Sequence, residues 1–293
     1  MCQNPRVNKP LAMLTTSDHD RAAAGMAYVY PVVSRRAGGV SVGVNLNPNN
    51  ACNWRCIYCQ VPDLQRGGPP PVDLARLDGE LRRMLAGIVR GDFMQEHVPA
   101  GLRRLNDVAL SGNGEPTSAV EFDHVIGLVA RAMEDFGLVE KGVKLVLITN
   151  GSLAHRAYVQ AGIRRMAMTH GEVWFKFDRA TREGMRLVND SETDPERHFQ
   201  RLGQVARLCP TWVQTCMFAL DGSPPSTEEI DAYLAMLARA RSDGMPLRGV
   251  LLYGLARPSQ QAEAPRLGPL PESWMQELGS RIEDLGLPAR ITL

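Results

Sequence analysis

The sequence predicts a mixed α/β fold, a partial (β/α)6 barrel that resembles an incomplete TIM barrel. Three observations predict it. Short β-branched runs alternate with amphipathic stretches, the alternation repeats six times, and no change of composition separates the units. Alternation of this kind makes the strands parallel, with right-handed crossovers. Because a closed barrel of this type has eight units, six units predict a barrel that stays open.

Each unit follows from a local pattern. Residues 40–46 alternate in the manner of a strand, and the turn-forming run 47–50 ends them. Apolar residues between 74 and 88 recur at helical spacing, which predicts a helix packed on the core. The nearly all-apolar run 144–149 is typical of a buried parallel strand. The predicted strands are 40–46, 107–111, 144–149, 172–178, 212–219 and 247–254, and the predicted helices are 74–88, 125–132, 158–166, 195–208, 227–241 and 272–285.

The composition narrows the class of protein. Of 293 residues, 44% are apolar and 22% are charged, which is enough for a large core and unlike a disordered chain. The net charge of +1 argues against a dominating electrostatic grip on nucleic acid. No apolar run is long enough to span a membrane, so we expect no membrane partner.

We expect two parts along the chain. The opening stretch is polar and weakly patterned, so residues 1–38 are expected to form an N-terminal arm or cap. Residues 39–293 are expected to form the barrel domain, ending in a C-terminal helix. Within it, Ser152 is expected to cap the helix that follows the third strand.

Three cysteines follow the first predicted strand. Cys52, Cys56 and Cys59 have the spacing C-x3-C-x2-C, with no fourth cysteine nearby. A [4Fe–4S] cluster normally takes four thiolates, so three leave one iron open for a small ligand. A zinc site is the alternative, but zinc sites favour pairs of C-x2-C, and neither Cys209 nor Cys216 forms a second pair. An odd local group cannot pair off as disulfides, and its metal-type spacing predicts a reducing cytoplasm.

This motif, with Tyr58 just before the third cysteine, resembles the signature of the radical S-adenosylmethionine (SAM) enzymes. The resemblance implies a radical SAM core with Cys52, Cys56 and Cys59 as ligands of one [4Fe–4S] cluster, and SAM on the open iron. In that family an electron from the cluster cleaves SAM, and the resulting 5′-deoxyadenosyl radical abstracts a hydrogen atom from the substrate. Tyr58 is counted among the cofactor-binding residues.

A second motif follows the second strand. Gly112, Asn113, Gly114 and Glu115 resemble the Gly-Gly-Glu turn that binds the SAM amino group, with asparagine in place of the second glycine. Glycine allows a sharp turn and close approach, and a carboxylate accepts from an ammonium group. The resemblance therefore implies that Glu115 contacts the SAM amino group, directly or through water.

Further candidates lie at the ends of the third and fourth strands. Thr149 and Asn150 end the third strand, where the family holds the ribose and the methionine carboxylate. On the fourth strand, Trp174, Lys176 and Asp178 share one face because side chains alternate. Lys176 and Asp178 are expected either as a structural ion pair or as part of the cofactor site, with Lys176 binding the SAM carboxylate or a substrate acid.

The last two strands add weaker candidates. Gln214 is expected to hydrogen-bond SAM or substrate. Cys216, on the same face, is either an inert buried thiol or a donor that returns a hydrogen atom to a substrate radical. Tyr253 and Arg257, at the end of the sixth strand, are expected to border the adenine and the substrate.

Residues 39–258 are most similar to stand-alone bacterial radical SAM proteins near the tRNA wyosine-synthesis enzymes. The archaeal wyosine enzymes carry a second cluster and a pyruvate-binding lysine, whereas this chain has only Cys2 upstream and only Lys9 near its start. We therefore expect one cluster and an external flavodoxin- or ferredoxin-type electron donor. The substrate is an RNA base, a peptide or a small metabolite, with RNA favoured by the resemblance. The alternative from another class is a non-catalytic metal-binding or redox-sensing protein.

Overall fold

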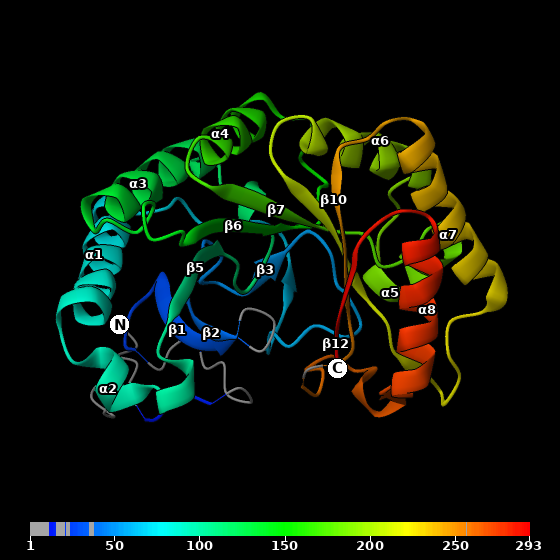
Figure 1. The fold of residues 1–293 in the computed structure, drawn as a ribbon, viewed down its shortest axis with the longest axis horizontal. Coiled ribbons are helices and arrows are strands. Elements are labelled where there is room, and N and C mark those ends of the chain that lie inside the picture. Colours follow the sequence, from blue (N-terminus) through cyan, green and yellow to red (C-terminus); the bar gives the residue numbers. More distant parts are fainter. Residues whose placement is uncertain (1–11, 16–20, 22–23, 35–37, 256) are drawn as a thin grey trace.

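A curled sheet of eight strands forms a half-barrel, and helices cover its outer face (Figure 1). The computed structural model describes residues 12–15, 21, 24–34, 38–255 and 257–293. Every neighbouring pair in the sheet is parallel except the first. The predicted partial barrel of parallel strands is confirmed. In spatial order the strands are β1 (Val29–Ser34), β2 (Gly39–Val44), β5 (Leu105–Leu110), β6 (Lys144–Thr149), β7 (Gly171–Lys176), β8 (Thr211–Cys216), β10 (Leu247–Tyr253) and β12 (Ala289–Thr292).

The six predicted strands correspond to β2, β5, β6, β7, β8 and β10, and a helix of the structure overlaps each predicted helix. The helices are α1 (Leu74–Arg90), α2 (Phe93–His97), α3 (Phe122–Asp135), α4 (Ala157–Ala167), α5 (Arg182–Asn189), α6 (Pro195–Ala206), α7 (Thr227–Ser242) and α8 (Glu272–Asp284). Short strands complete the fold: β3 (Ala51–Cys52), β4 (Gln65–Arg66), β9 (Ala219–Leu220) and β11 (Leu267–Gly268). No described helix is both long and apolar enough to cross a membrane.

Strand β1 corrects one expectation. It lies within residues 1–38, which were expected to form an arm, yet it is the antiparallel edge strand of the main sheet. Pro31 sits inside this strand opposite Val42. Proline has no backbone N–H to donate, so it argues against a strand in the sequence. It is nevertheless tolerated in the edge strand of a sheet, which is where β1 lies. Cys2 and Lys9 lie outside the described residues.

Two helices also differ from expectation. Ser152 does not cap α4, because that helix begins five residues later with Arg156 at its N-cap position. Helix α5, which was not predicted, begins after Thr181, whose side chain accepts a hydrogen bond from the Gly184 amide. Strand β12 and helix α2 were not predicted either.

The core lies between the sheet and its outer helices. Leu77, Leu81 and Leu85 of α1 are fully buried at helical spacing. Each such side chain contributes about 1.5–3 kcal/mol through burial. The predicted alternation of β7 is confirmed, because Phe175 and Phe177 join this core while Trp174 and Lys176 face the barrel interior.

A buried histidine joins α6 to β7. The centroid of the His198 ring lies 5.0 Å from that of Phe175 and 4.5 Å from that of Phe177. Its Nε2 lies 2.9 Å from the Lys176 carbonyl oxygen. Burial disfavours the charged imidazolium and lowers the pKa of His198 to about 4. The imidazole is therefore neutral at physiological pH and packs as part of the core.

We expect Gly43→Ala to destabilise the hairpin of β1 and β2. A Cβ at Gly43 would lie 2.2 Å from the Tyr30 ring, so the ring and its strand must shift. Overpacking of this kind costs about 1–3 kcal/mol. The control is Gly79→Ala on the exposed side of α1, where nothing lies within 4 Å. It should stabilise the protein by about 0.5–1 kcal/mol, because glycine is unfavourable inside a helix. Urea unfolding that ranks the two variants in the opposite order would contradict the packing.

We expect His198 to make stability depend on acid pH. The unfolded imidazole takes up a proton near its usual pKa of 6.5, whereas the folded one does so only near 4. The contribution of neutral His198 to the free energy of unfolding is therefore fully present above pH 6.5. It is lost as the pH falls towards 4, and the loss amounts to roughly 3 kcal/mol. Urea unfolding between pH 4 and 7 should show a flatter pH dependence for His198→Leu. Replacement of the exposed His124 by leucine should keep the wild-type slope.

Candidate functional site

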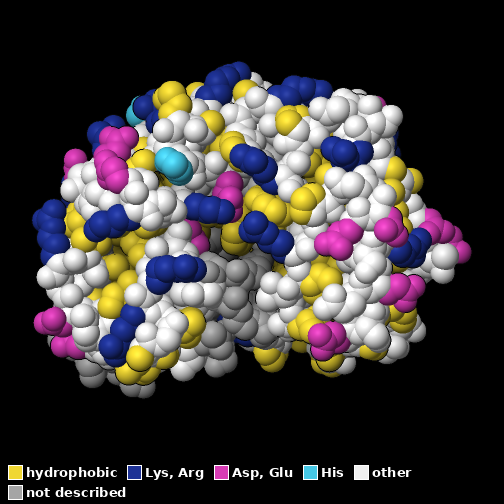
Figure 2. Space-filling model, in the orientation of Figure 1, with side chains coloured by type: hydrophobic (Ala, Val, Ile, Leu, Met, Phe, Trp, Pro, Cys, Tyr) yellow, Lys and Arg dark blue, Asp and Glu magenta, His cyan; other side chains and the backbone are white. Residues whose placement is uncertain are grey.

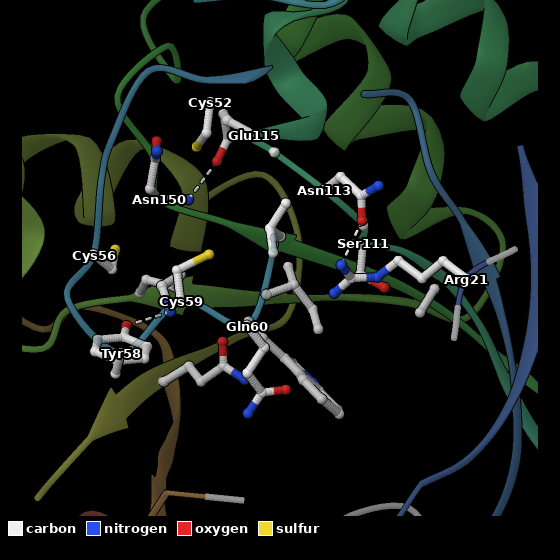
Figure 3. A pocket seen from close by; sticks show the side chains of 18 of the residues that line it. Arg21, Cys52, Cys56, Tyr58, Cys59, Gln60, Ser111, Asn113, Glu115 and Asn150 are labelled. Atoms are coloured by element: carbon white, nitrogen blue, oxygen red, sulfur yellow. Dashed lines mark hydrogen bonds between the residues drawn. The ribbon is translucent and has the colours of Figure 1, made fainter. Parts of the chain in front are cut away.

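A cavity of about 290 Å³ lies at the carboxyl ends of the central strands. All three motif cysteines line it, together with the glycine turn that follows β5. Figure 3 shows the cysteines along one side of this cavity, Glu115 beside Cys52, and Asn113 towards Arg21. The structure thus brings the two sequence motifs together. The other predicted residues that line the cavity are Tyr58, Asn150, Lys176, Gln214, Tyr253 and Arg257.

The cysteine loop is held on one side by the end of α5. The amide of Arg55 donates to the Asn189 carbonyl at 3.2 Å, and the amide of Ile57 donates to the Val188 carbonyl at 2.9 Å. The last carbonyls of a helix have no partner within the helix, so the loop satisfies them. This unpredicted helix therefore fixes the backbone on both sides of Cys56.

A segment about 200 residues away holds the other side of the loop. Ser259 Oγ donates to the Ile57 carbonyl at 2.7 Å, and the Gln260 amide donates to the Cys59 carbonyl at 2.8 Å. Gln261 Nε2 lies 3.0 Å from the Val61 carbonyl. These bonds satisfy carbonyl groups that an irregular loop cannot satisfy by itself. No local sequence signal marked this segment.

Ion pairs close the loop at the surface. Arg55 makes a two-pronged contact with Glu263, at 3.0 and 2.6 Å, which raises the pKa of the arginine and lowers that of the Glu263 carboxyl. Arg66 of β4 pairs with Asp190 at 2.7 Å, and Arg55 lies 3.5 Å from the same carboxylate. The Arg66 contact lowers the pKa of Asp190. Because these groups are partly exposed, the network contributes more to geometry than to stability.

Two of the motif thiols, Cys52 and Cys56, are weaker acids than a free cysteine. Burial raises the pKa of Cys52 to about 11, although backbone N–H groups of Trp54 and Glu115 oppose the change. Burial raises the pKa of Cys56 to about 12, against the opposing charge of Lys176. A metal ligand must be a thiolate, so metal binding here has to displace protons.

The three cysteines fit a cluster better than a single ion. Among the residues that the structure describes, no three Cys, His, Asp or Glu side chains are grouped for one metal ion. Structural zinc requires its ligands to converge on one point. A [4Fe–4S] cluster binds each thiolate through a different iron, so its ligands stay apart around a shared volume. Thiols that line one cavity without converging match the second arrangement.

Glu115 is a buried carboxylate held by four donors. Its Oε1 accepts from the Thr117 amide, the Thr117 hydroxyl and Thr149 Oγ1, the last at 2.6 Å. Its Oε2 accepts from the Asn150 amide at 2.7 Å. Burial raises the pKa of the carboxyl group, and these hydrogen bonds counteract that change. The side chain is thus fixed at the cavity wall as an acceptor for a cationic group.

Close packing explains the two glycines of the turn. A Cβ at Gly112 would lie 2.3 Å from Asn45 Oδ1, and one at Gly114 would lie 2.1 Å from the Ala51 carbonyl oxygen. Neither glycine has a positive φ. The turn therefore needs glycine because it presses against the start of the cysteine loop.

Asn113, which replaces a glycine of the family pattern, joins the two motifs. Its Nδ2 donates to Asn50 Oδ1 at 2.6 Å, and its amide donates to Asn45 Oδ1 at 3.0 Å. Its Oδ1 accepts from Arg21. The substitution therefore adds contacts to the residue just before the cysteine loop.

Thr149 and Asn150 divide their roles. Thr149 holds Glu115 and is not among the residues that line the cavity. Asn150 lines the cavity, and its Nδ2 donates to Asn53 Oδ1 at 2.9 Å. Thr149 therefore acts on the site through Glu115, whereas Asn150 can contact a ligand.

Lys176 and Asp178 are linked mainly through Tyr58. Lys176 Nζ lies 4.0 Å from Asp178 Oδ2 but donates to Tyr58 Oη at 2.6 Å, and Tyr58 donates in turn to Asp178. Burial would lower the pKa of Lys176, but Tyr253 and Asp178 outweigh it, so the pKa lies well above its usual value. Lys176 lines the cavity as a cation, while Asp178 lies behind it.

Two residues of β8 have different surroundings. Gln214 is buried and lines the cavity, and its Oε1 has no hydrogen-bond partner in the described part of the chain. Cys216 does not line the cavity, because it packs with Tyr58, Val188 and Phe218, and burial raises its pKa to about 12. This placement favours the inert thiol over the hydrogen donor.

A second cavity, of about 650 Å³, lies towards the amino ends of the strands. Asp107 and Trp174 line both cavities. On the face drawn in Figure 2, Lys and Arg side chains gather around a central hollow. The second cavity itself has several basic residues in its wall, among them Lys144, which pairs with Glu172 at 2.7 Å. Its basic residues are Arg103, Arg104, Lys141, Lys144 and Arg290.

Sequence comparison identifies a distant relative. No known family model matches the chain. The "UPF0026 protein" of Helicobacter pylori (strain ATCC 700392 / 26695) is 28% identical over 139 residues, which cover 46% of this chain. The match spans 38% of that relative's length.

Structural comparison is more extensive. The structure of TYW1 with a lysine-pyruvate adduct bound matches with a TM-score of 0.53 and 14% identity, over 86% of this chain and 74% of that one. A radical SAM methyltransferase from Sphaerobacter thermophilus matches with a TM-score of 0.51 and 14% identity, over 87% and 66%. At 14% sequence identity, these structural matches show a shared fold and nothing finer. The chain therefore has the fold of the radical SAM enzymes, as its cysteine motif predicts.

Proposed function

We propose that this chain is a radical SAM enzyme with a single [4Fe–4S] cluster on Cys52, Cys56 and Cys59. The observation that carries the proposal is that these three thiols line one cavity with Glu115 and do not converge on a single-ion site. A cluster on these three thiols would leave one iron open for a small ligand, and the polar residues of the cavity wall would suit a zwitterionic one.

The chain's own residues suit SAM in that cavity. Glu115 offers a fixed carboxylate to an ammonium group, and Lys176 offers a cation to a carboxylate. Asn150 and Gln214 supply further amide groups in the same cavity wall. When bound, the cluster and SAM supply a 5′-deoxyadenosyl radical for hydrogen abstraction from a C–H bond, while the protein binds, orients and shields the reactants.

We propose that the electron comes from an external donor. Among the described residues, the two other cysteines, Cys209 and Cys216, are buried in separate hydrophobic clusters and do not form a second cysteine motif. Reduction of the cluster thus requires an electron-donor protein. The proposed donor is a flavodoxin- or ferredoxin-type protein of the cytoplasm. Arg55 and Arg66 on the loop offer it a partly exposed charged surface.

The proposed substrate is an RNA base, with a peptide or a small metabolite as alternatives. The sequence resemblance supports RNA. The cavity wall contains three cationic side chains, Arg21, Lys176 and Arg257, beside the carboxylates Asp107 and Glu115, so it offers partners to a substrate with an anionic part. Comparison of modified nucleosides in RNA from a deletion strain and its parent tests the choice, and unchanged RNA would remove the RNA substrate.

Anaerobic reconstitution tests the activity itself. We expect four irons and four sulfides per chain, and 5′-deoxyadenosine after reduction in the presence of SAM. A non-catalytic metal-binding or redox-sensing protein is the competing function. Bound zinc, or a cluster that never cleaves SAM, would support that alternative.

Cys56→Ala should abolish both cluster binding and SAM cleavage, because a cube with two protein ligands is not held. The control is Cys216→Ala, which removes a buried thiol that lies outside the cavity. Iron content and 5′-deoxyadenosine formation measure the result. A Cys56→Ala protein with full iron content would show that the cluster lies elsewhere.

Glu115→Gln should weaken SAM binding about 10- to 100-fold, because a charge-assisted hydrogen bond contributes about 1.5–3 kcal/mol. Isothermal titration of the reconstituted protein measures the dissociation constant. Glu172→Gln is the control, since Glu172 lines the second cavity and not the first. Equal affinity of the Glu115→Gln and wild-type proteins would remove Glu115 from the cofactor site.

A further inference from the structure

The side chain of Asn189 lies between a cysteine of the loop and a buried carboxylate. It is 1% exposed, and its Nδ2 is 3.3 Å from Cys56 Sγ and 2.8 Å from Asp178 Oδ2. An ionised carboxylate can only accept hydrogen bonds, so the amide nitrogen, not its oxygen, has to face Asp178. One hydrogen of the NH2 group therefore points to Asp178, and the other is available to the sulfur.

Asp178 is itself held in place. Its Oδ1 accepts from the Cys216 amide at 2.9 Å, and its Oδ2 accepts from Tyr58, which accepts in turn from Lys176. The carboxylate is 1% exposed, so it cannot exchange these donors for water. The orientation of the Asn189 amide is thus imposed by a chain of hydrogen bonds that ends at the cavity wall.

The sulfur is held as firmly as the amide. Backbone bonds from Arg55 and Ile57 to the last carbonyls of α5 fix the residues on both sides of Cys56. The backbone of α5 and of the loop therefore fixes where the two residues lie, and the hydrogen bond to Asp178 orients the Asn189 amide beside Sγ. Asn189 lies 133 residues from Cys56, so no local pattern could predict the contact.

We propose that Asn189 is a positioning residue that raises the reduction potential of the cluster through an N–H···S hydrogen bond to Cys56. The inference rests on the proposed function, since it needs a cluster on this thiolate. Reduction adds one electron from the external donor and increases the negative charge on the cluster and its sulfur ligands. A donor aimed at a ligand sulfur stabilises the more negative state. No proton leaves Asn189 in this step.

The test is a redox titration of the reconstituted protein followed by electron paramagnetic resonance. Asn189→Ala should lower the equilibrium constant for reduction about tenfold, which is about 59 mV for a one-electron couple. Val188→Ala is the matched control. Val188 precedes Asn189 and packs beside Tyr58 and Cys216. Its replacement by alanine removes buried side-chain volume but leaves the backbone hydrogen bond to Ile57 intact. Its potential should equal that of the wild type.

A second variant and a wild-type measurement complete the test. Asp178→Asn removes the carboxylate that orients Asn189, but it also removes a negative charge that acts on Cys56, and this loss by itself raises the potential. The potential of Asp178→Asn should therefore lie above that of Asn189→Ala. Pulsed resonance on the wild type in D2O should show an exchangeable deuteron coupled to the cluster, weaker in Asn189→Ala. An unchanged potential in Asn189→Ala, or no such deuteron in the wild type, would overturn the inference. A wild-type chain that takes up no cluster would instead overturn the proposed function.

Discussion

The site depends on the anchoring of one irregular loop across the strand ends. Beyond the two-residue strand β3 (Ala51–Cys52) this loop is irregular, so its backbone polar groups need partners from elsewhere. The end of α5 supplies acceptors for Arg55 and Ile57, and residues 259–261 supply donors for the carbonyls of Ile57, Cys59 and Val61. The fold brings both supports to the loop, and the cysteines are positioned as a result.

Two buried carboxylates organise the space beside the loop. Glu115 and Asp178 are each nearly inaccessible to water, which would be costly for an unpaired charge. Each is instead surrounded by donors: Glu115 by Thr117, Thr149 and the Asn150 amide, Asp178 by Tyr58, Asn189 and the Cys216 amide. Because each carboxylate accepts several bonds at once, it fixes several site residues together. These buried polar groups fix the positions of the site residues more than they stabilise the folded state.

Local patterns predicted the repeating part of the molecule well. The strand and helix periods marked all six units, and side-chain alternation placed Lys176 and Gln214 inside the barrel. The same reasoning was weaker at the strand ends. It placed Thr149 and Asp178 among the cofactor contacts and offered Cys216 as a candidate hydrogen donor, whereas none of the three lines the cavity. Alternation specifies a face of a strand, but not which of its side chains reaches the ligand.

The sequence by itself determined the repeat, the cysteine motif and the turn beside it, because these are properties of neighbouring residues: strand and helix periods, cysteine spacing, and two glycines around Asn113. The tertiary structure alone decided how the loop is held and what surrounds its sulfurs. Asn189 reaches Cys56 across 133 residues, and Ser259 reaches Ile57 across 202. Contacts over such separations leave no periodic trace in the chain, since they exist only after the strands have assembled and curled.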